Sequence, residues 1–402
     1  MKIRVGVLFG GKSVEHEVSI ISALQAIQSI PLEKYEVVPI YITKDNEFYV
    51  GQDMGDVNAY KDVKSLLNRS QRVTLVNQKN CVDLLKIPYK RLGNPIYDSI
   101  DLAFPIVHGT NVEDGTLQGL LKMLNIPFVG CDVTSSAVGM DKYIMKTILK
   151  DCEIPVLDCL CFHQYAYQEN VDAICKQVIE KIDFPVIVKP LNLGSSIGIR
   201  LAKDEESLEE AMEYAFEFSN KILVEKAVEH LKEINCAVLG DAELAEASEC
   251  EEPINADDIL SFEDKYLTTE GSKGKMDSTR SGSKGGMTSL KRKLPADITS
   301  DMRNKIRKMA VDTFQVLDCN GVARIDFLMN TKTNEVWVNE INTIPGSLSF
   351  YLWEPIGCSY SQLLEKMIEL SFKRQRELES IEFTFETNIL NCTQIGGMKG
   401  KA

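Results

Sequence analysis

The stretch R-I-D-F-L-M-N-T-K-T-N-E-V-W-V-N-E-I-N-T-I-P-G, residues 324–346, is the most informative part of this 402-residue chain. Two runs that are rich in β-branched and aromatic residues, 322–329 and 335–341, flank a polar segment at 330–334. Alternating apolar runs on either side of a short polar turn are typical of a β-hairpin. The sequence therefore predicts a hairpin with its turn near Thr333.

One face of this hairpin would carry a polar cluster. Because side chains alternate along a strand, Asp326 would lie opposite Glu340, and Arg324 opposite Asn342, all on the same face. Two carboxylates and an amide oxygen are ligands that suit Mg²⁺ or Mn²⁺, and Mg²⁺ usually shares its site with phosphates. A solvated face with cross-strand pairs is the simpler alternative. The apolar neighbours favour buried strands, however, and buried acids need a partner.

Length and composition limit the class of protein. A chain of 402 residues with 44% hydrophobic residues predicts two or three globular domains. The net charge of −14 argues against a general nucleic-acid binder. No apolar run of about 18 residues is present, so we expect no membrane span. Eleven cysteines without a secretory signal predict reduced thiols and a cytoplasmic location.

The order of the predicted elements indicates an α/β fold with three domains. Residues 1–130 begin with a strand, a helix and a strand, and they predict a Rossmann-like domain with a parallel sheet. Residues 131–236 and 237–402 each predict an α+β domain. The predicted strands outside the hairpin are 3–9, 35–42, 101–108, 126–129, 184–189, 221–226 and 235–239. The predicted helices are 19–29, 116–124, 141–152, 205–216, 296–317 and 361–377.

A Gly/Ser/Lys-rich segment, 265–293, interrupts the last domain. A loop of this length inside a compact domain is usually disordered or functional, and a mobile lid would suit a reactive site. The tail 396–402 is expected to be frayed.

Lysines would supply the basic side of the site. Lys189 ends a predicted buried strand, and a buried lysine needs an anion. The turn G-S-S-I-G at 194–198 follows it; such a turn lets backbone N–H groups approach a phosphate, although it lacks the Walker A spacing and is most often only a turn. Lys142 at a helix start and Lys265 beside the long loop could add charge. Together with the acidic face, these features indicate a nucleoside triphosphate site.

At this point the chain resembles the D-alanine–D-alanine ligases of the ATP-grasp superfamily, over nearly its whole length. The motifs that carry the resemblance are G-G-K-S-V-E-H-E-V-S (10–19), H-G-T-N-V-E-D-G-T-L-Q-G (108–119), M-D-K (140–142), K-P-L-N-L-G-S-S-I-G (189–198), L-V-E-K-A-V (223–228), D-K-Y-L (264–267), A-R-I-D-F (323–327) and N-E-I-N-T-I-P-G (339–346). The resemblance implies a Rossmann-like domain followed by two α+β ATP-grasp subdomains with ATP between them. It also implies ligation of two D-alanines through a D-alanyl phosphate, for peptidoglycan precursor synthesis.

The resemblance further implies a role for each matching position. The positions implied for ATP are Lys142, Lys189, Ser196, Glu225, Lys226, Val228, Glu233 and Lys265, with Glu225 and Val228 at adenine and Glu233 at the ribose. Those implied for two Mg²⁺ or Mn²⁺ ions are Asp326, Glu340 and Asn342. The ammonium group of the first D-alanine would be bound by Glu15, hydrogen-bonded with Ser195 and Tyr266, and His108 would lie nearby. Arg324 and the N–H of Gly346 would stabilise the oxyanion. Relatives are often dimers, so a homodimer is expected.

Several of these residues also have structural interpretations. Glu15 could favour the start of a helix through the macrodipole. Ser195 could be a turn residue, Tyr266 a packing residue of the lid, and His108 a structural histidine. Glu113 and Asp114 are expected to serve the start of the next helix.

The second substrate is the least determined part of the site. Tyr351 and Leu352 stand where relatives commonly have a Ser-Leu pair whose serine helps to bind the second carboxylate. Tyr351 could supply a hydroxyl, or Ser347 or Ser349 could replace it. Tyr266 is typical of relatives that form the dipeptide, so D-alanyl-D-alanine is the predicted product. The alternatives are a ligase that makes D-Ala-D-Ser or D-Ala-D-lactate, and a non-catalytic ATP-binding regulator, which would be expected to have lost the metal ligands or Arg324.

Overall fold

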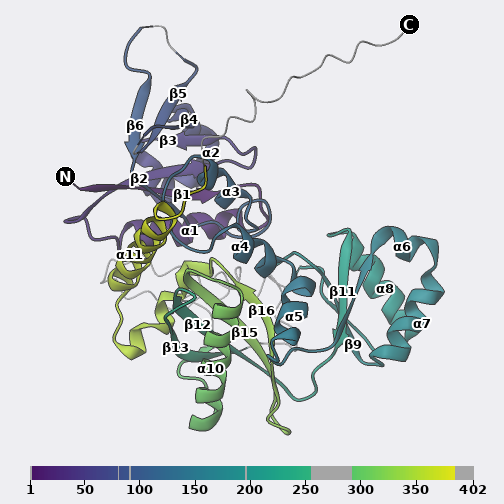
Figure 1. Ribbon diagram of the computed structural model, residues 1–402. Coiled ribbons are helices and arrows are strands. Elements are labelled where there is room, and N and C mark those ends of the chain that lie inside the picture. Colours follow the sequence, from purple (N-terminus) through teal and green to yellow (C-terminus); the bar gives the residue numbers. More distant parts are fainter. Residues whose placement is uncertain (1, 80, 90–91, 195–196, 255–291, 385–402) are drawn as a thin grey trace, which may run out of the picture.

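Three β-sheets organise the part of the protein that the structure describes (Figure 1). The computed structural model describes the whole chain except residues 1, 80, 90–91, 195–196, 255–291 and 385–402. The sheets have seven, four and five strands. Most of the predicted lid and the whole of the predicted frayed tail lie outside the described residues.

The N-terminal sheet is parallel at its centre and antiparallel beyond it. β1 (Ile3–Gly10) lies between β2 (Tyr35–Ile42) and β7 (Leu102–Pro105) and is parallel to both, as the Rossmann-like prediction requires. The polar segment after β2 adds four antiparallel strands that the sequence did not predict. They are β3 (Phe48–Val50), β4 (Gln71–Asn77), β5 (Val82–Ile87) and β6 (Ile96–Ile100). The helical elements of this region are α1 (His16–Ile27), η1 (Gln52–Gly55), η2 (Val57–Asp62), α2 (Val63–Asn68), α3 (Thr116–Met123) and α4 (Val133–Met140).

A small antiparallel sheet and its helices form a separate lobe, at the right of Figure 1. Its strands are β8 (Cys159–His163), β9 (Val186–Pro190), β10 (Arg200–Ala202) and β11 (Lys221–Lys226). Its helices are α6 (Gln164–Glu169), α7 (Val171–Lys181) and α8 (Glu205–Phe216). Val186, Val188, Ile222 and Val224 alternate along β9 and β11, and they are buried in a core of their own with α7 and α8. The opposite side chains, Lys189 and Glu225, are therefore directed away from that core.

The third sheet carries the predicted hairpin. β15 (Gly321–Asn330) and β16 (Val336–Asn342) pair with Arg324 opposite Asn342 and Asp326 opposite Glu340, so the predicted register is confirmed. The other strands are β12 (Leu231–Gly240), β13 (Ala245–Pro253) and β14 (Arg292–Lys293). The helices α5 (Lys142–Asp151) and α10 (Ser300–Val316) pack against it through Met145, Leu149, Ile306, Ala310 and Phe314.

Two sequence predictions need correction here. The boundary expected after residue 236 falls inside β12, which pairs with β15 along its whole length. We propose that the boundary lies between Lys226 and Leu231, where the chain leaves the small sheet. The strand expected at 126–129 is only an isolated bridge between Ala103 and Phe128.

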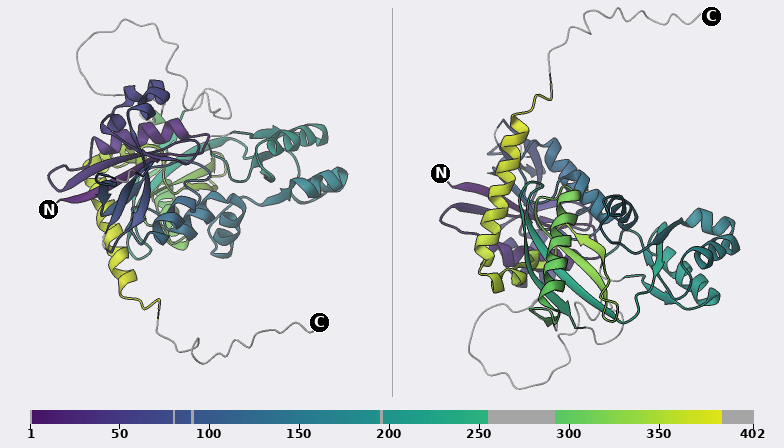
Figure 2. Two further views of the ribbon diagram at one scale, coloured as in Figure 1. Left: turned by 90° about the horizontal axis from the view of Figure 1, so that it is seen from above. Right: turned by 60° about the horizontal axis from the view of Figure 1, so that its bottom comes forward.

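The C-terminal segment completes a core that it shares with the N-terminal domain. The turn η5 (Gly346–Leu352) packs on α1, and η6 (Glu354–Ile356) leads to α11 (Tyr360–Glu379). Their buried residues join one apolar cluster with the N-terminal sheet, alongside which α11 runs (Figure 2). Arg374 donates to the carbonyls of Phe128 and Gly130. Neither α11 nor any other helix in the described part of the chain is long and apolar enough to cross a membrane.

Truncating this shared core should destabilise the protein. Leu364 on α11 is fully buried, so Leu364→Ala should lower the free energy of unfolding by about 2–5 kcal/mol. Leu244→Ala, at a leucine that is 79% exposed, is the matched control and should change it by less than about 0.5 kcal/mol. Urea denaturation of both variants measures the difference, and similar losses would contradict the assignment of Leu364 to the core.

Candidate functional site

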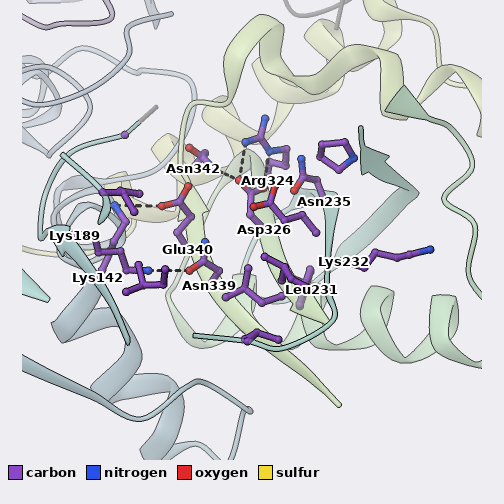
Figure 3. A pocket seen from close by; sticks show the side chains of 18 of the residues that line it. Lys142, Lys189, Leu231, Lys232, Asn235, Arg324, Asp326, Asn339, Glu340 and Asn342 are labelled. Carbon is purple, nitrogen blue, oxygen red and sulfur yellow. Dashed lines mark hydrogen bonds and ion pairs between the residues drawn. The ribbon is translucent and has the colours of Figure 1, made fainter. Parts of the chain in front are cut away.

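A cavity of about 1050 Å³ lies where the three sheets meet. Both the small sheet and the hairpin sheet contribute to its wall (Figure 3). Of the residues predicted for the site, those that line it are Glu15, His108, Lys142, Lys189, Glu225, Lys226, Val228, Glu233, Arg324, Asp326, Glu340, Asn342, Gly346 and Tyr351. The structure thus brings together residues that are more than 300 positions apart in the sequence.

The hairpin presents the polar face that the sequence predicts. Arg324 donates from Nε and Nη2 to the two oxygens of Asp326, at 2.6 and 2.7 Å. Asn342 donates from Nδ2 to Asp326 at 3.1 Å. Glu340 forms an ion pair with Lys142, at 3.2 Å, across the cavity. Each carboxylate of this face therefore has a cationic side chain beside it.

The chemistry of this donor set fits a hard divalent cation. Asn342 uses its amide nitrogen toward Asp326, which leaves the amide oxygen as a possible ligand. Two carboxylates and one amide oxygen are too few for an all-protein Mg²⁺ site, but Mg²⁺ commonly keeps water and binds phosphates as well. Within the described residues, no group of three His, Cys, Asp or Glu side chains is placed to hold a metal ion. A cation here would thus depend on Asn342 and on a bound ligand.

A buried charge cluster faces the hairpin from the small sheet. Lys189 Nζ lies 2.5 Å from Glu225 Oε1 and donates to Asn339 Oδ1 at 3.0 Å. Lys146 Nζ contacts the other oxygen of Glu225 at 2.6 Å. Burial alone would raise the pKa of Glu225, but the two ammonium groups outweigh it and lower the pKa to about 2. Glu225 is therefore a carboxylate at any physiological pH.

Glu15 lies under the glycine-rich turn. A Cβ built on Gly194 would lie 3.1 Å from Glu15 Oε2, and one built on Gly109 would lie 3.0 Å from it. Lys142 Nζ donates to Leu193 O, in the residue before Gly194, at 2.8 Å. Leu193 and Gly194 thus lie close to Glu15, the residue before α1, and a side chain at Gly109, whose φ is 83°, would clash with Ser13 Oγ.

His108 holds the backbone on both sides of Gly346. Its Nδ1 lies 2.8 Å from Ile344 O, and its Nε2 lies 2.9 Å from Ser22 Oγ, which also accepts from Ser347 N at 2.9 Å. A carbonyl can only accept, so Nδ1 carries the proton and Nε2 accepts from the hydroxyl of Ser22. Burial, and to a smaller extent the charge of Arg324, lowers the pKa of His108 to about 4. The ring is therefore neutral at pH 7.

The segment after Gly346 has an unusual backbone. Ser347, Leu348 and Ser349 have φ angles of 50°, 51° and 49°, in the left-handed region. Each such non-glycine residue costs about 1–2 kcal/mol. Burial of Leu348 in the shared core and the hydrogen bond from Ser347 N to Ser22 offset this cost.

Glu113 binds the residues just before Gly346, not the next helix as expected. Its Oε1 accepts from Ile344 N at 2.9 Å and from Thr343 Oγ1 at 3.3 Å, and its Oε2 accepts from Gly109 N at 2.9 Å. Burial, and to a smaller extent the charge of Glu15, raises the pKa of Glu113 to about 8. Asp114 does serve α3, because its Oδ1 accepts from Thr116 N at 3.1 Å.

Tyr351 stands at another part of the wall. Its hydroxyl donates to Glu251 Oε1 at 3.0 Å, and the guanidinium of Arg292 lies 4.0 Å from its ring centre. Arg292 Nη1 also donates to Glu251 Oε2 at 2.8 Å. By contrast, the side chains of Ser347 and Ser349 are buried and do not line the cavity. Of the three hydroxyls considered for the second substrate, the tyrosine is the one that reaches the cavity.

Some predicted residues stand apart from this assembly. Leu352 is fully buried in the shared core and is not a cavity-lining residue, so we leave its side chain out of the substrate site. Ser195, Ser196, Lys265 and Tyr266 lie outside the described residues.

Sequence reasoning missed the roles of several polar residues that line the site or support its wall. They are Ser22, Glu113, Lys146, Asn235, Glu251, Arg292 and Asn339. Lys146 had a usable signal, because it follows Lys142 by four residues on a predicted helix and so shares its face. The others depend on tertiary pairing between distant strands, for which the sequence carries no local pattern.

The buried neutral state of His108 predicts a pH effect on stability. Its folded pKa of about 4 lies below the ordinary value of 6.5, so the unfolded chain binds a proton that the folded chain does not between these values. Stability from this group is present above pH 6.5 and is lost as the pH falls toward 4. The free energy of unfolding of the parent protein should therefore fall by about 2 kcal/mol more than that of His108→Gln between pH 7 and pH 5. Urea denaturation at both pH values tests this; parallel losses would refute it.

Comparison with known proteins places the chain in a family. The family described as D-ala D-ala ligase C-terminus matches residues 148–369, and D-ala D-ala ligase N-terminus matches residues 4–131. A D-alanine–D-alanine ligase of Thermosipho melanesiensis is 40% identical over 388 residues, which cover 96% of this chain and 98% of that protein. One from Acetivibrio thermocellus is 37% identical over 390 residues, covering 94% and 97%.

Solved structures of related ligases have the same fold as this chain. The D-alanine-D-alanine ligase from Coxiella burnetii superposes with a TM-score of 0.77 at 29% identity, covering 97% of each chain. The VanG D-Ala:D-Ser ligase from Enterococcus faecalis gives a TM-score of 0.74 at 30% identity, covering 92% of this chain and 100% of that one. With both family domains matched in order and relatives similar over nearly their full length, this chain belongs to the D-alanine–D-alanine ligase family.

Proposed function

We propose that this protein is an ATP-dependent ligase that joins two molecules of D-alanine, forming D-alanyl-D-alanine, ADP and phosphate, for peptidoglycan precursor synthesis. The observation that carries the proposal is the single cavity in which the acidic face of the hairpin, the lysines of the facing elements and Glu15 of the N-terminal domain come together. Family membership supports the same reaction. A cytoplasmic location and a homodimer stay predictions from the sequence.

ATP would bind between the small sheet and the hairpin sheet. Lys142 and Lys189 would contact the phosphates, since both ammonium groups line the cavity on the side that faces the acidic hairpin. Adenine would lie against the backbone near Val228 and Lys226, with Glu233 at the ribose. Glu225 could still accept from the adenine amino group, because each carboxylate oxygen can accept two hydrogen bonds.

Asp326, Glu340 and Asn342 would hold Mg²⁺ or Mn²⁺, and two ions per site are expected from the resemblance. When bound, the ions would neutralise charge on the phosphates during transfer. Lys142, which now pairs with Glu340, would be released toward the phosphates, whereas Arg324 would stay oriented by Asp326.

The first half-reaction activates a carboxylate. Glu15 would bind the ammonium group of the first D-alanine. A carboxylate oxygen of that D-alanine would then attack the γ-phosphorus of ATP. The bond from that phosphorus to the bridging oxygen breaks, which gives D-alanyl phosphate and ADP. Ser195, Tyr266 and Lys265 would complete this part of the site, and the segment 265–293 would cover it, because an acyl phosphate hydrolyses in water.

In the second half-reaction, the amine of the second D-alanine attacks the acyl carbon and loses a proton, and collapse of the tetrahedral oxyanion expels phosphate. Arg324 and the N–H of Gly346 would stabilise the oxyanion. Two donors of Arg324 are held by Asp326, which orients the guanidinium and leaves three donors for the substrate. His108, Ser22 and Glu113 hold the backbone around Gly346 and so fix the direction of its N–H.

Tyr351 would contact the second substrate. The stacked guanidinium of Arg292 is a natural partner for a carboxylate near the tyrosine ring. Such a site would suit the carboxylate of D-alanine without selecting strongly by size.

The substrate proposal is tested by measuring phosphate release and product mass with ATP, Mg²⁺ and D-alanine, alone or with D-serine or D-lactate in excess. D-Alanine alone should support turnover and give D-alanyl-D-alanine. The absence of turnover with D-alanine alone, together with a mixed product when D-serine or D-lactate is added, would instead assign one of those as the second substrate.

The oxyanion role of Arg324 predicts an asymmetric loss. Arg324→Ala should lower kcat by about 10²–10³-fold and change the KM for ATP much less, because the lost donor acts in the transition state. Arg376→Ala, at an exposed arginine of α11, is the control and should keep both parameters. Steady-state kinetics measure both, and losses of equal size in kcat and in ATP affinity would argue against the role.

A further inference from the structure

The buried cluster of Lys146, Glu225 and Lys189 carries a charge imbalance. Their side chains are 1%, 3% and 5% exposed, and the two ammonium groups share one carboxylate. The cluster therefore has a net charge of +1. If Lys146 were absent, Glu225 and Lys189 would neutralise each other. Because a buried charge is only weakly screened, this difference of one charge strongly changes the electrostatic potential in the adjoining cavity.

The position of Lys146 separates it from the site itself. Lys189 and Glu225 line the cavity, whereas Lys146 is not among the residues that do so. It extends from α5, whose Met145 and Leu149 pack in the core of the hairpin sheet, and it reaches Glu225 on β11 of the small sheet. Lys142, one helical turn earlier, extends from the same helix to Leu193 and Glu340. One helix thus supplies one lysine to the cavity and another to the back of its wall.

We propose that Lys146 is a positioning residue for nucleotide binding: it takes one oxygen of Glu225 and so leaves Lys189 with uncompensated positive charge for the phosphates. The inference rests on the proposed binding of ATP in this cavity. Asn339 supports it, because its neutral oxygen holds Lys189 Nζ on the cavity side without removing its charge. If Lys146 had only a structural role, it would stabilise the fold through its ion pair with Glu225 without affecting the binding of phosphates.

The test compares nucleotides with and without phosphates. Isothermal titration calorimetry gives the dissociation constants of adenosine and of ADP. The ratio of the constant for adenosine to the constant for ADP isolates the contribution of the phosphates. Lys146→Met keeps the length of the side chain and removes its charge. It should lower this ratio on the order of tenfold, mainly by weakening ADP, whereas Lys146→Arg should keep the ratio near that of the parent.

Two further variants close the cycle. Glu225→Gln raises the net charge of the cluster from +1 to +2 and should raise the ratio. The double variant Lys146→Met/Glu225→Gln returns it to +1 and should restore the ratio even if adenine contacts are weakened, because adenosine and ADP share those contacts. If Lys146→Met does not fold, as judged by circular dichroism, the change of the ratio in Glu225→Gln alone decides between the inference and a structural role.

The outcomes separate the inference from the proposed function. If the parent protein binds neither ADP nor adenosine, the proposed ATP site fails. If the parent binds both and Lys146→Met weakens both equally, Lys146 has only a structural role. An unchanged or lowered ratio in Glu225→Gln would also overturn the inference.

Discussion

Most of the charged side chains that the described residues bury at the junction of the sheets lie beside an opposite charge, and most of these partners come from another element. Glu340 on β16 meets Lys142 on α5, Glu225 on β11 meets Lys146 on α5 and Lys189 on β9, and Asp326 meets Arg324 on its own strand. An uncompensated charge in such a place is costly. The sheets are therefore held in the arrangement that satisfies these charges, and that arrangement builds the cavity. A ligand with phosphates and a divalent cation brings both signs of charge, so it can exchange partners with these side chains without leaving any of them alone.

The parts of this arrangement that could be predicted are those with a local sequence pattern. The alternation of residues along 322–341 and the polar turn near Thr333 were sufficient to pair Asp326 with Glu340 and Arg324 with Asn342, and the structure confirms that register. Motifs in family order gave the three-part fold. The antiparallel strands after β2 were not predicted, because they mix polar residues with apolar ones such as Val73, Val82 and Leu84, which are buried in the N-terminal core, and no family motif covers them. The boundary expected after residue 236 falls inside β12, and we propose that it lies earlier, in the partly exposed link between β11 and β12.

The site follows the same division. Residues in motifs mostly gather in the cavity, whereas the residues that support them were missed. Glu113 is an example: its place before α3 suggested a helix-start role, and only the tertiary structure brings Ile344 and Thr343 to its carboxylate. Ser22 looks like an ordinary residue of α1, yet it joins His108 to Ser347. Such groups bind backbone atoms of distant residues. Because every residue has nearly the same backbone atoms, the sequence does not indicate which residues they will bind.

The shared core of the N-terminal sheet and α11 has a consequence for how the chain acquires its structure during synthesis. The strands of the N-terminal sheet leave the ribosome before α11, but the same cluster includes Trp353, Leu364 and Ile368. That face of the sheet cannot be fully covered until the chain has been made to about residue 368. The newly made N-terminal domain therefore keeps apolar surface exposed to solvent while more than 200 further residues are added. Packing of α11 thus completes the core of the N-terminal sheet.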